Sequence, residues 1–578
     1  MRREHCDTVL YNGKIVTVDE HFSIAEAVAI GDGKFLEVGG NAEVRALAHR
    51  HTKEIDLEGK TVVPGFIDTH PHMIHKAICP DERFSARGTE TIVSLVGLSS
   101  IEAIKERIAE KVERTPQGKW IVTSPIGEPP YYFNVPGTLK ESRWPSRWDL
   151  DEVSPHNPVY IAPPSSRAPN TTILNSYGLK LIGVTKDTPS EQQDVRVVKD
   201  PETGEPTGQF QGMQRIYNFS PLLKKLNQLL PQATLDEMVN ELRAAIKERN
   251  AAGVTAVYEA HDVFSKHLLP CKELWSRDEL TMRICFAYEV DVTKSLSEIE
   301  SWIKGLAHAT GSGFGDDWLK ICGINVPIDA PIRFGLGLMK EPYLDPYGKP
   351  TTGVQLVPTE TLKHIALLAA RNNLRLNSCI SGNKATDVTL KVFEEVNREI
   401  PIKDRRWAIQ HVQFASQENF DKCKELGVCV TVCTNFEWGE GAEVYVGRLG
   451  RDLAAKAMPL RPWLDAGVCI SQGTDFGPYQ PMFTIWQSLK RVHGLTGESL
   501  AGPEQKITRE EALRMYTIDG ARVLFWEDKL GSIEAGKLAD LVVLDNDILT
   551  CPLDEIKDTK VLMTMVGGEV VYEGQRDP

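Results

Sequence analysis

The middle of the chain alternates short apolar runs typical of β-strands with amphipathic stretches typical of helices. The helical stretches include residues 235–253 and 359–373, and strand-like runs recur around them. Such alternation is typical of parallel βα units, which can close into a (β/α)8 TIM-like barrel. Nine runs are candidates for eight barrel strands, so at least one lies outside the barrel: 62–70, 158–164, 254–260, 283–290, 319–326, 374–380, 406–412, 428–433 and 468–475.

Both ends of the chain are rich in short strands and tight turns instead. Dipeptides typical of hairpin turns separate β-rich runs at three places: Asn12-Gly13, Asp32-Gly33 and Gly567-Gly568. The economical architecture joins the two ends into one small domain, with the barrel inserted between them. We therefore expect an α/β protein in which residues 1–64 and 530–578 form a composite β-sandwich and residues 65–529 form the barrel.

A long insertion is expected within the barrel at about 78–225. It is rich in proline, which removes backbone donors and breaks helices, so we expect loop-like rather than helical structure there. Such a segment would form a lid or a wall of a substrate site, or a contact between subunits of a homo-oligomer.

The composition excludes several classes of partner. The chain has 66 Lys and Arg against 80 Asp and Glu, a net charge of −14, which disfavours binding to nucleic acid or to an anionic membrane. No apolar run reaches the roughly 18 residues of a transmembrane helix, and the first residues lack the apolar region of a secretory signal. Eleven cysteines without a CxxC pair fit reduced thiols, so we expect a cytoplasmic protein.

The first predicted barrel strand ends in Thr69-His70-Pro71-His72. Residues i and i+2 of a strand point the same way, so His70 and His72 would face the mouth of the barrel together. Two imidazoles from one strand suit a transition metal such as zinc, iron or manganese. A solvated pair of histidines near a turn is the alternative that the spacing alone leaves open.

Two end motifs resemble the amidohydrolase superfamily. GKTVVPGFIDTHPHM (59–73) is similar to its first barrel strand, and GSIEAGKLADLVVLD (531–545) is similar to the return of its C-terminal β-sandwich. Four internal segments resemble the large branch that includes the N-substituted formamide deformylases and, more distantly, the D-aminoacylases: 202–212, 251–260, 406–413 and 472–481. The resemblance covers nearly the whole chain. It implies a metal-dependent hydrolase acting on a small molecule.

The resemblance also assigns roles to single residues. His70 and His72 match the metal-binding pair of the family. Asp475 in Gly473-Thr474-Asp475 matches the Asp that binds metal and accepts a proton from the attacking water. His411 matches the histidine of the sixth strand, as a metal ligand or a catalytic donor to the oxyanion.

Two positions depart from the family pattern. Asn325 stands where the branch carries a carbamylated lysine that bridges two metals, and Asn cannot be carbamylated. Cys379 stands where the fifth-strand histidine is expected, although a small register shift would put Asn377 there. Cys379 is either a thiolate ligand or a buried, inert thiol. We therefore expect one divalent transition metal per chain, with zinc first and iron or manganese next.

Other residues are candidates of lower specificity. Glu259 in Tyr-Glu-Ala-His is a substitute carboxylate ligand or a salt-bridged strand end. Arg167 would hold a substrate carboxylate, unless it is a surface residue. Trp438 is a pocket wall or a packing anchor. Asn325 and Cys379 are placed on the substrate side as well.

The function expected from these residues is hydrolysis of a non-peptide C–N bond (amide, formamide, carbamate or cyclic imide) by metal-activated water. The alternative keeps one metal and changes the reaction to deamination, C–O hydrolysis or a non-hydrolytic lyase or decarboxylase step. A catalytically inactive binding scaffold is a third reading, although the metal-binding set of the family remains in place.

Overall fold

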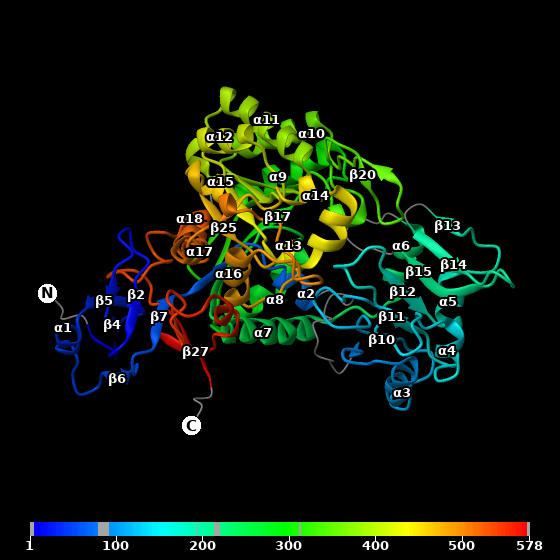
Figure 1. The fold of residues 1–578 in the computed structure, drawn as a ribbon, viewed down its shortest axis with the longest axis horizontal. Helices are drawn as coiled ribbons and strands as arrows, with labels where there is room; N and C mark the ends of the chain where they lie inside the picture. The colour runs from blue at the N-terminus through cyan, green and yellow to red at the C-terminus, as the bar shows by residue number, and fades with distance from the viewer. Residues whose placement is uncertain (1–4, 79–91, 193–194, 213–219, 311–313, 575–578) are drawn as a thin grey trace. The chain divides into compact units, whose positions relative to one another are not determined.

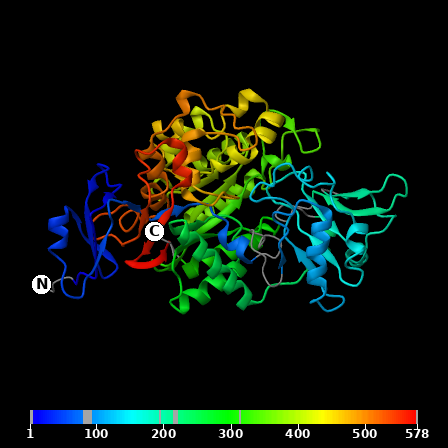
Figure 2. The ribbon, with the colours of Figure 1, turned by 60° about the horizontal axis from the view of Figure 1, so that its bottom comes forward.

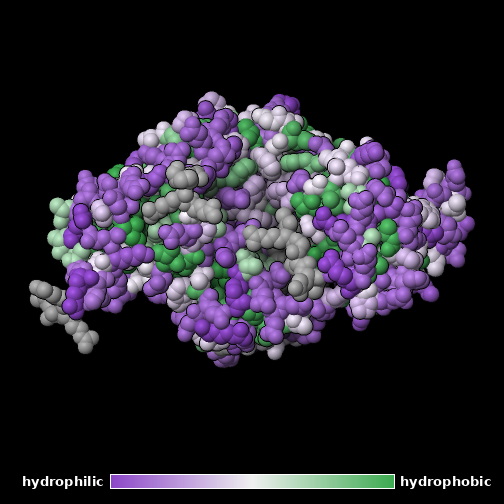
Figure 3. All heavy atoms as spheres, turned by 90° about the horizontal axis from the view of Figure 1, so that it is seen from below, coloured by the Kyte–Doolittle hydropathy of each residue, from purple (hydrophilic) through white to green (hydrophobic). Residues whose placement is uncertain are grey.

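The computed structural model describes residues 5–78, 92–192, 195–212, 220–310 and 314–574, and the chain divides into two units (Figure 1). Unit 1 comprises Met1–Ile74, Leu242–Asp345 and Pro350–Pro578, and unit 2 comprises His75–Glu241 and Pro346–Lys349. Hydrophilic residues predominate on the face shown in Figure 3. Among the described residues, no helix combines the length and apolar character needed to cross a bilayer.

Eight parallel strands of unit 1 form the predicted TIM-like barrel. In spatial order they are β8 (Phe66–Asp68), β16 (Val254–Glu259), β17 (Arg283–Glu289), β19 (Leu319–Pro327), β22 (Arg375–Ile380), β23 (Ala408–His411), β24 (Cys429–Val432) and β25 (Ile470–Gln472). The backbone N–H of Thr69, just after β8, donates to the carbonyl of Gln472 in β25 at 3.1 Å and so brings the first and last strands together. The predicted barrel is confirmed.

Helices follow the barrel strands and bury one face each. The main ones are α7 (Leu235–Ala251), α8 (Ser265–Ser276), α9 (Leu296–Thr310), α10 (Thr359–Arg371), α11 (Asn383–Glu399), α12 (Gln417–Leu426), α15 (Leu460–Asp465), α16 (Pro481–Lys490), α17 (Arg509–Met515) and α18 (Ile518–Leu524). In α11, Thr389, Phe393 and Val396 recur at helical spacing and are fully buried. The ring of Phe393 packs 4.9 Å from that of Trp407, which precedes β23. Apolar periodicity therefore fixes which side of α11 faces the barrel.

Strands from both ends of the chain share one sheet of unit 1. Its order is β28 (Glu569–Glu573), β27 (Val561–Val566), β26 (Leu541–Leu544), β7 (Thr61–Pro64), β2 (Lys14–Val16) and β3 (Ile24–Ala25). A second sheet has the order β5 (Lys34–Gly39), β4 (Ala27–Gly31), β1 (Thr8–Tyr11) and β6 (Lys53–Asp56). Leu10, Phe35, Leu541 and Met563 belong to one buried apolar cluster, so residues from both ends share a core. Figures 1 and 2 both show the C-terminal strands in red beside the N-terminal strands in blue.

Two of the three predicted hairpins are confirmed. Asp32-Gly33 joins the antiparallel strands β4 and β5, and Gly567-Gly568 joins β27 and β28. The prediction for Asn12-Gly13 is wrong, because β1 and β2 pair with partners in different sheets. The turn has the expected left-handed geometry, with a φ of 59° at Asn12, yet it carries the chain from one sheet to the other. Turn chemistry is local, whereas the strand partner is chosen by the rest of the fold.

Gly65 lies where β7 of the terminal sheet becomes β8 of the barrel. A Cβ at this position would lie 2.1 Å from the side-chain oxygen of Thr255 in β16, so the close approach of the two strands requires glycine. A buried ion pair joins the same two parts of unit 1. The Nε and Nη2 atoms of Arg283 in β17 each lie 2.8 Å from a carboxylate oxygen of Asp540, the residue before β26.

Unit 2 contains a mixed seven-stranded sheet, and the prediction of a loop-like insertion is wrong. The sheet order is β13 (Glu191–Gln192), β14 (Val195–Lys199), β15 (Pro206–Gln211), β12 (Thr171–Leu174), β11 (Val159–Ile161), β10 (Ile121–Thr123) and β9 (Ile92–Val93). Its helices are α3 (Ile101–Val112), α4 (Arg147–Asp151), α5 (Ser176–Ile182) and α6 (Pro221–Leu229). The run predicted at 158–164 is β11, which makes it the surplus ninth candidate. The prolines lie mainly in the connections, where they leave the strand hydrogen bonds intact.

Short elements complete the described chain. They are α1 (Asn41–Arg45), α2 (Met73–Ile78), α13 (Asn435–Glu440), a π-helix at Gly441–Leu449, α14 (Arg451–Ala454), β18 (Phe314–Gly315), β20 (Tyr343–Leu344) and β21 (Pro350–Thr351), with 3-10 turns at Ile332–Phe334, Lys403–Arg405, Pro503–Gln505 and Leu553–Asp558.

Candidate metal centre

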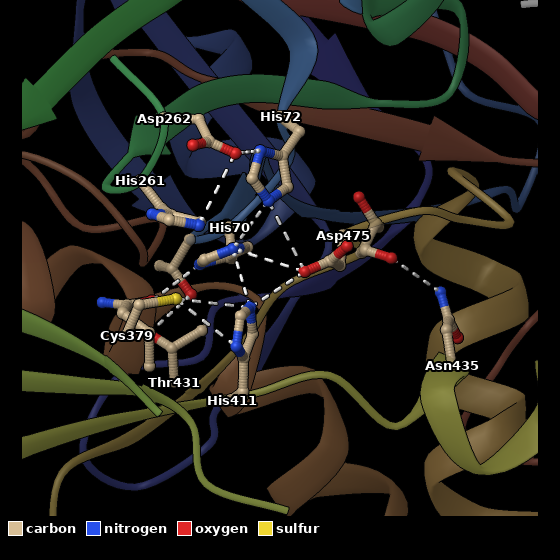
Figure 4. Close-up of polar contacts among 12 residues, drawn as sticks. His70, His72, His261, Asp262, Cys379, His411, Thr431, Asn435 and Asp475 are labelled. Carbon is tan, nitrogen blue, oxygen red and sulfur yellow. Dashed lines mark hydrogen bonds and ion pairs between the residues drawn. The ribbon is translucent and has the colours of Figure 1, made fainter. Parts of the chain in front are cut away.

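Four side chains meet at the C-terminal ends of the barrel strands (Figure 4). They are His70, His72, His411 and Asp475, and one ligand atom from each lies within 4.8 Å of the others. Nε2 of His70 lies 3.1 Å from Nε2 of His72 and 2.9 Å from Nε2 of His411. Oδ2 of Asp475 lies 2.9 Å from Nε2 of His411 and 3.3 Å from Nε2 of His70. All four residues are buried.

Neighbouring side chains fix the orientation of His70. Its Nδ1 lies 2.9 Å from Oε1 of Gln410, so Nδ1–H donates there and the Nε2 lone pair points toward the other three side chains. Asp68 accepts hydrogen bonds from the backbone N–H groups of His70 and Thr474, both at 3.1 Å. The N–H of Asp475 donates in turn to the carbonyl of His70 at 2.8 Å. The segments that carry His70 and Asp475 are therefore tied to each other beside the ends of β8 and β25.

The electrostatics of His70, His72 and Asp475 favour a bound cation, whereas for His411 burial is outweighed by Cys379 and Asp475, which raise its pKa to about 10. Burial, reinforced for His70 by neighbouring His411, lowers the pKa values of His70 and His72, which keeps both rings in the neutral form that binds metals. Burial opposes ionisation of Asp475, but His72 and His411 hold the pKa of this carboxyl well below its usual range. Three imidazoles and one carboxylate are a donor set that fits zinc or another divalent transition ion.

The two departures from the family pattern have different surroundings. Sγ of Cys379 lies 3.5 Å from Nδ1 of His411, so Cys379 borders the cluster. Asn377, the alternative for this position, donates instead to the hydroxyl of Tyr258 at 2.6 Å. The Nδ2 of Asn325 donates to Oε2 of Glu289 at 2.8 Å, and no atom of Asn325 belongs to the four-residue cluster. Cys379, rather than Asn377, is therefore the fifth-strand residue that contacts His411.

Three other candidates lie outside the four-residue cluster. Oε1 of Glu259 accepts the backbone N–H of Ile74 at the start of α2 at 2.9 Å, its buried Oε2 has no hydrogen-bond partner among the described residues, and the carboxyl does not belong to the four-residue cluster. Burial raises the pKa of Glu259 to about 7. Trp438 is half-buried on α13 with its ring 5.3 Å from that of Phe483, and Arg167 is half-buried after β11 in unit 2.

Several residues around the cluster carry no motif of their own. Gln410 contacts His70, Glu289 ends β17, and His261 and Asp262 follow β16. His261 belongs to the same Tyr-Glu-Ala-His run as Glu259, and this polar strand end is the signal that could have found it. Glu289 was visible only as a polar residue at a strand end, and Gln410 as the neighbour of His411.

Backbone conformation marks the same region. Four non-glycine residues of the site have left-handed φ angles: 47° at His72, 58° at Asp262, 71° at His411 and 48° at Asp475. L-residues seldom adopt this conformation, and it is concentrated at functional sites.

Comparison with known proteins decides the family. Residues 53–572 match the amidohydrolase family. The chain belongs to this family. It is 28% identical to an N-substituted formamide deformylase of Arthrobacter pascens, with 98% of each chain covered. It is also 26% identical to the protein LONG AFTER FAR-RED 3 of Arabidopsis thaliana, covering 98% of this chain and 91% of the relative.

Solved structures support the fold of this amidohydrolase. An uncharacterized metal-dependent hydrolase from Pyrococcus furiosus superimposes with a TM-score of 0.71 at 23% identity, over 94% of this chain and 100% of the other. The zinc complex of the atrazine chlorohydrolase TrzN from Arthrobacter aurescens TC1 superimposes with a TM-score of 0.51 at 14% identity, over 98% and 95%. Family membership and the buried His/Asp cluster make the chain a metal-dependent hydrolase acting on C–N bonds.

Proposed function

We propose that the protein hydrolyses the C–N bond of a small amide, with N-substituted formamides as the first substrates to test. The observation that carries this proposal is the convergence of three imidazole Nε2 atoms and one carboxylate at the C-terminal end of the barrel. The similarity to a formamide deformylase over 98% of both chains supports the choice of substrate class. Carbamates and cyclic imides, which contain a similar C–N bond, are the next substrates to test.

His70, His72, His411 and Asp475 hold one divalent ion in this proposal, with zinc first and iron or manganese next. Such an ion polarises a carbonyl and lowers the pKa of water. Asp475 accepts the proton of the attacking water and passes it to the leaving nitrogen. His411 has one of two roles through its Nε2, which lies 2.9 Å from Oδ2 of Asp475: it is the fourth ligand of the ion, or it donates to the developing oxyanion.

Four residues are proposed to contact the substrate: Arg167, Asn325, Cys379 and Trp438. Cys379 is the best supported, because it borders His411. Glu259 is left out of the proposed ligand set because it does not belong to the four-residue cluster, although its buried Oε2 has no hydrogen-bond partner among the described residues.

A second candidate reaction is favoured by Asn325. This residue cannot supply the carbamate that bridges two ions, and one-metal sites of such barrels also suit deamination, C–O hydrolysis or lyase and decarboxylase steps. A panel of formamides, amides, esters and aminopurines, each incubated with the zinc-loaded enzyme, separates the two. Turnover of esters or amines with none of any amide would replace the proposed reaction by this alternative.

Metal analysis tests the centre itself. The chelated protein should lose activity on the panel and regain it with zinc. His70→Ala and His72→Ala should each lower metal content and rate together, whereas His51→Ala, an exposed histidine of the N-terminal region, should change neither. Wild-type metal content in both site variants would contradict the proposed ligand set.

We also propose the domain organisation expected from the sequence: a composite β-sandwich of residues 1–64 and 530–578 around a barrel of 65–529. The antiparallel pairing of β7 with β26 and the shared apolar core support it. A cytoplasmic location is supported by the ten described cysteines, which form no disulfide. We also propose a homo-oligomeric state, and the molar mass measured by light scattering tests it.

A further inference from the structure

A second group of ligand atoms lies against the first, on the opposite edge of the His72 ring. It comprises Nδ1 or Nε2 of His72, an imidazole nitrogen of His261 and a carboxylate oxygen of Asp262, all within 4.8 Å of one another and all buried. Nε2 of His72 faces His70, and its Nδ1 lies 3.8 Å from Oδ2 of Asp262 (Figure 4). His261 and Asp262 both follow β16, the strand beside β8.

Asp262 carries the observation that points to a ligand. Its Oδ2 is buried and has no hydrogen-bond partner among the described residues, and the residue is 3% exposed. This oxygen lies 3.5 Å from Nε2 of His261 and 3.8 Å from Nδ1 of His72, too far for good hydrogen bonds to either ring. Ligands bound to zinc at ~2.0–2.2 Å lie about 3.4 Å apart around a tetrahedral ion. The spacing therefore suits a cation placed among the three atoms.

The support around His261 is that of a metal ligand. Its Nδ1 lies 3.1 Å from Oε2 of Glu289, which directs Nε2 toward Asp262. Glu289 is held in place by the side chain of Asn325 at 2.8 Å and by the backbone N–H of Asp262 at 3.1 Å. A carboxylate behind an imidazole fixes the tautomer and strengthens the ligand. Asn325 thus orients the carboxylate behind His261.

We propose that His261, Asp262 and Nδ1 of His72 form a second, weaker divalent-cation site beside the four-residue cluster. It rests on the proposed function, because the two ions share the ring of His72, with Nε2 on the first ion and Nδ1 on the second. Binding of both ions displaces the ring N–H proton to solvent. The carboxylates of Asp262 and Glu289 offset the added charge in place of a bridging carbamate.

The alternative role for Asp262 is to orient His72 by accepting its Nδ1–H, with no ion between them. The two roles differ in stoichiometry. A second site predicts that removing Asp262 lowers the number of bound ions and leaves the first ion tight. A positioning role predicts one ion in the wild type and weaker binding of that ion in the variant.

The test is a zinc titration of the chelated full-length protein, followed by calorimetry and by elemental analysis after equilibrium dialysis. We expect two equivalents in the wild type and one in Asp262→Asn and in His261→Gln, with the affinity of the tight step changed less than about threefold. The control variant Asp291→Asn removes an exposed carboxylate just after β17, and it should retain two equivalents of zinc. Saturation of the wild type at one equivalent, or two equivalents in both site variants, overturns the second site.

Two further readouts separate the possible failures. Binding of no zinc by the wild type would overturn the proposed function as well, whereas one equivalent overturns the second site alone. Should the variants fail to fold, anomalous density in wild-type crystals soaked in zinc decides the question. A peak between Asp262 and His261 is expected, and its absence at full occupancy of the first site rejects the inference.

Discussion

The buried ion pair between Arg283 and Asp540 should be the most sensitive contact between the barrel and the C-terminal strands. Arg283 is 1% exposed and Asp540 is 5% exposed, and two parallel hydrogen bonds of 2.8 Å join them. Oδ1 of Asp540 also accepts the N–H of Gly567 at 2.8 Å, in the turn between β27 and β28. Nη1 of Arg283 donates to the carbonyl of Asp317 at 2.9 Å.

Arg283→Met should lower the free energy of unfolding by about 3–5 kcal/mol. The substitution keeps most of the side-chain volume but leaves the carboxylate of Asp540 buried without its counter-charge, and breaking a buried pair in this way has that magnitude. Adding Asp540→Asn removes the stranded charge while its amide oxygen still accepts from Gly567. The double variant should therefore be at least ~1.5 kcal/mol more stable than the single one.

Urea unfolding followed by circular dichroism and by tryptophan fluorescence measures both variants. Lys529→Met is the matched control, because Lys529 pairs with Asp317, whose backbone carbonyl also accepts from Arg283. The Lys529–Asp317 pair is exposed, with side chains 52% and 37% accessible. It should change stability by less than about 0.5 kcal/mol. A change that small in Arg283→Met, or a double variant less stable than the single one, would refute the reasoning.

Three further outcomes are expected. Asp475→Asn should retain the fold and reduce turnover by at least ~10², since general-base steps contribute about 10²–10⁴; a rate within a few-fold of wild type would remove Asp475 from the mechanism. Glu259→Gln should retain wild-type metal content, because an amide oxygen can still accept the N–H of Ile74; loss of the ion, measured by elemental analysis, would restore Glu259 as a ligand. A chain ended before Gly531 should be insoluble, since β7 loses its partner β26 and apolar core is exposed, whereas one ended after Gly574 should stay soluble; a soluble, folded short chain would argue against a shared core.

The barrel could be predicted because its signal is local. Each strand is a short apolar run bounded by turn residues, and helical periodicity separates it from the next. The run at 158–164 has the same local character but pairs in unit 2, and nothing within the run distinguishes the two outcomes. Asn12-Gly13 failed as a hairpin for a similar reason, because pairing partners are set by contacts far away in sequence.

The site was predictable to the extent that its residues lie in motifs. His70, His72, His411 and Asp475 end their strands or follow them closely, and the barrel brings all four ends to one face. Glu289 ends β17 and contacts His261, which follows the neighbouring strand β16. No spacing within one segment predicts a contact between two strands. The prediction of a loop-like insertion failed for a different reason. Proline content indicates where connections lie, but it does not show whether short strands lie between them.

The left-handed residues of the site have a consequence for how the protein can evolve. Each costs roughly 1–2 kcal/mol relative to a right-handed or extended residue, so the four at His72, Asp262, His411 and Asp475 together withhold about 4–8 kcal/mol from the stability of the fold. Glycine at any of them relieves that cost and removes the side chain from the site. Selection for thermal stability alone would therefore act against the metal centre, and stabilised variants of this chain should be screened for metal content before they are screened for rate.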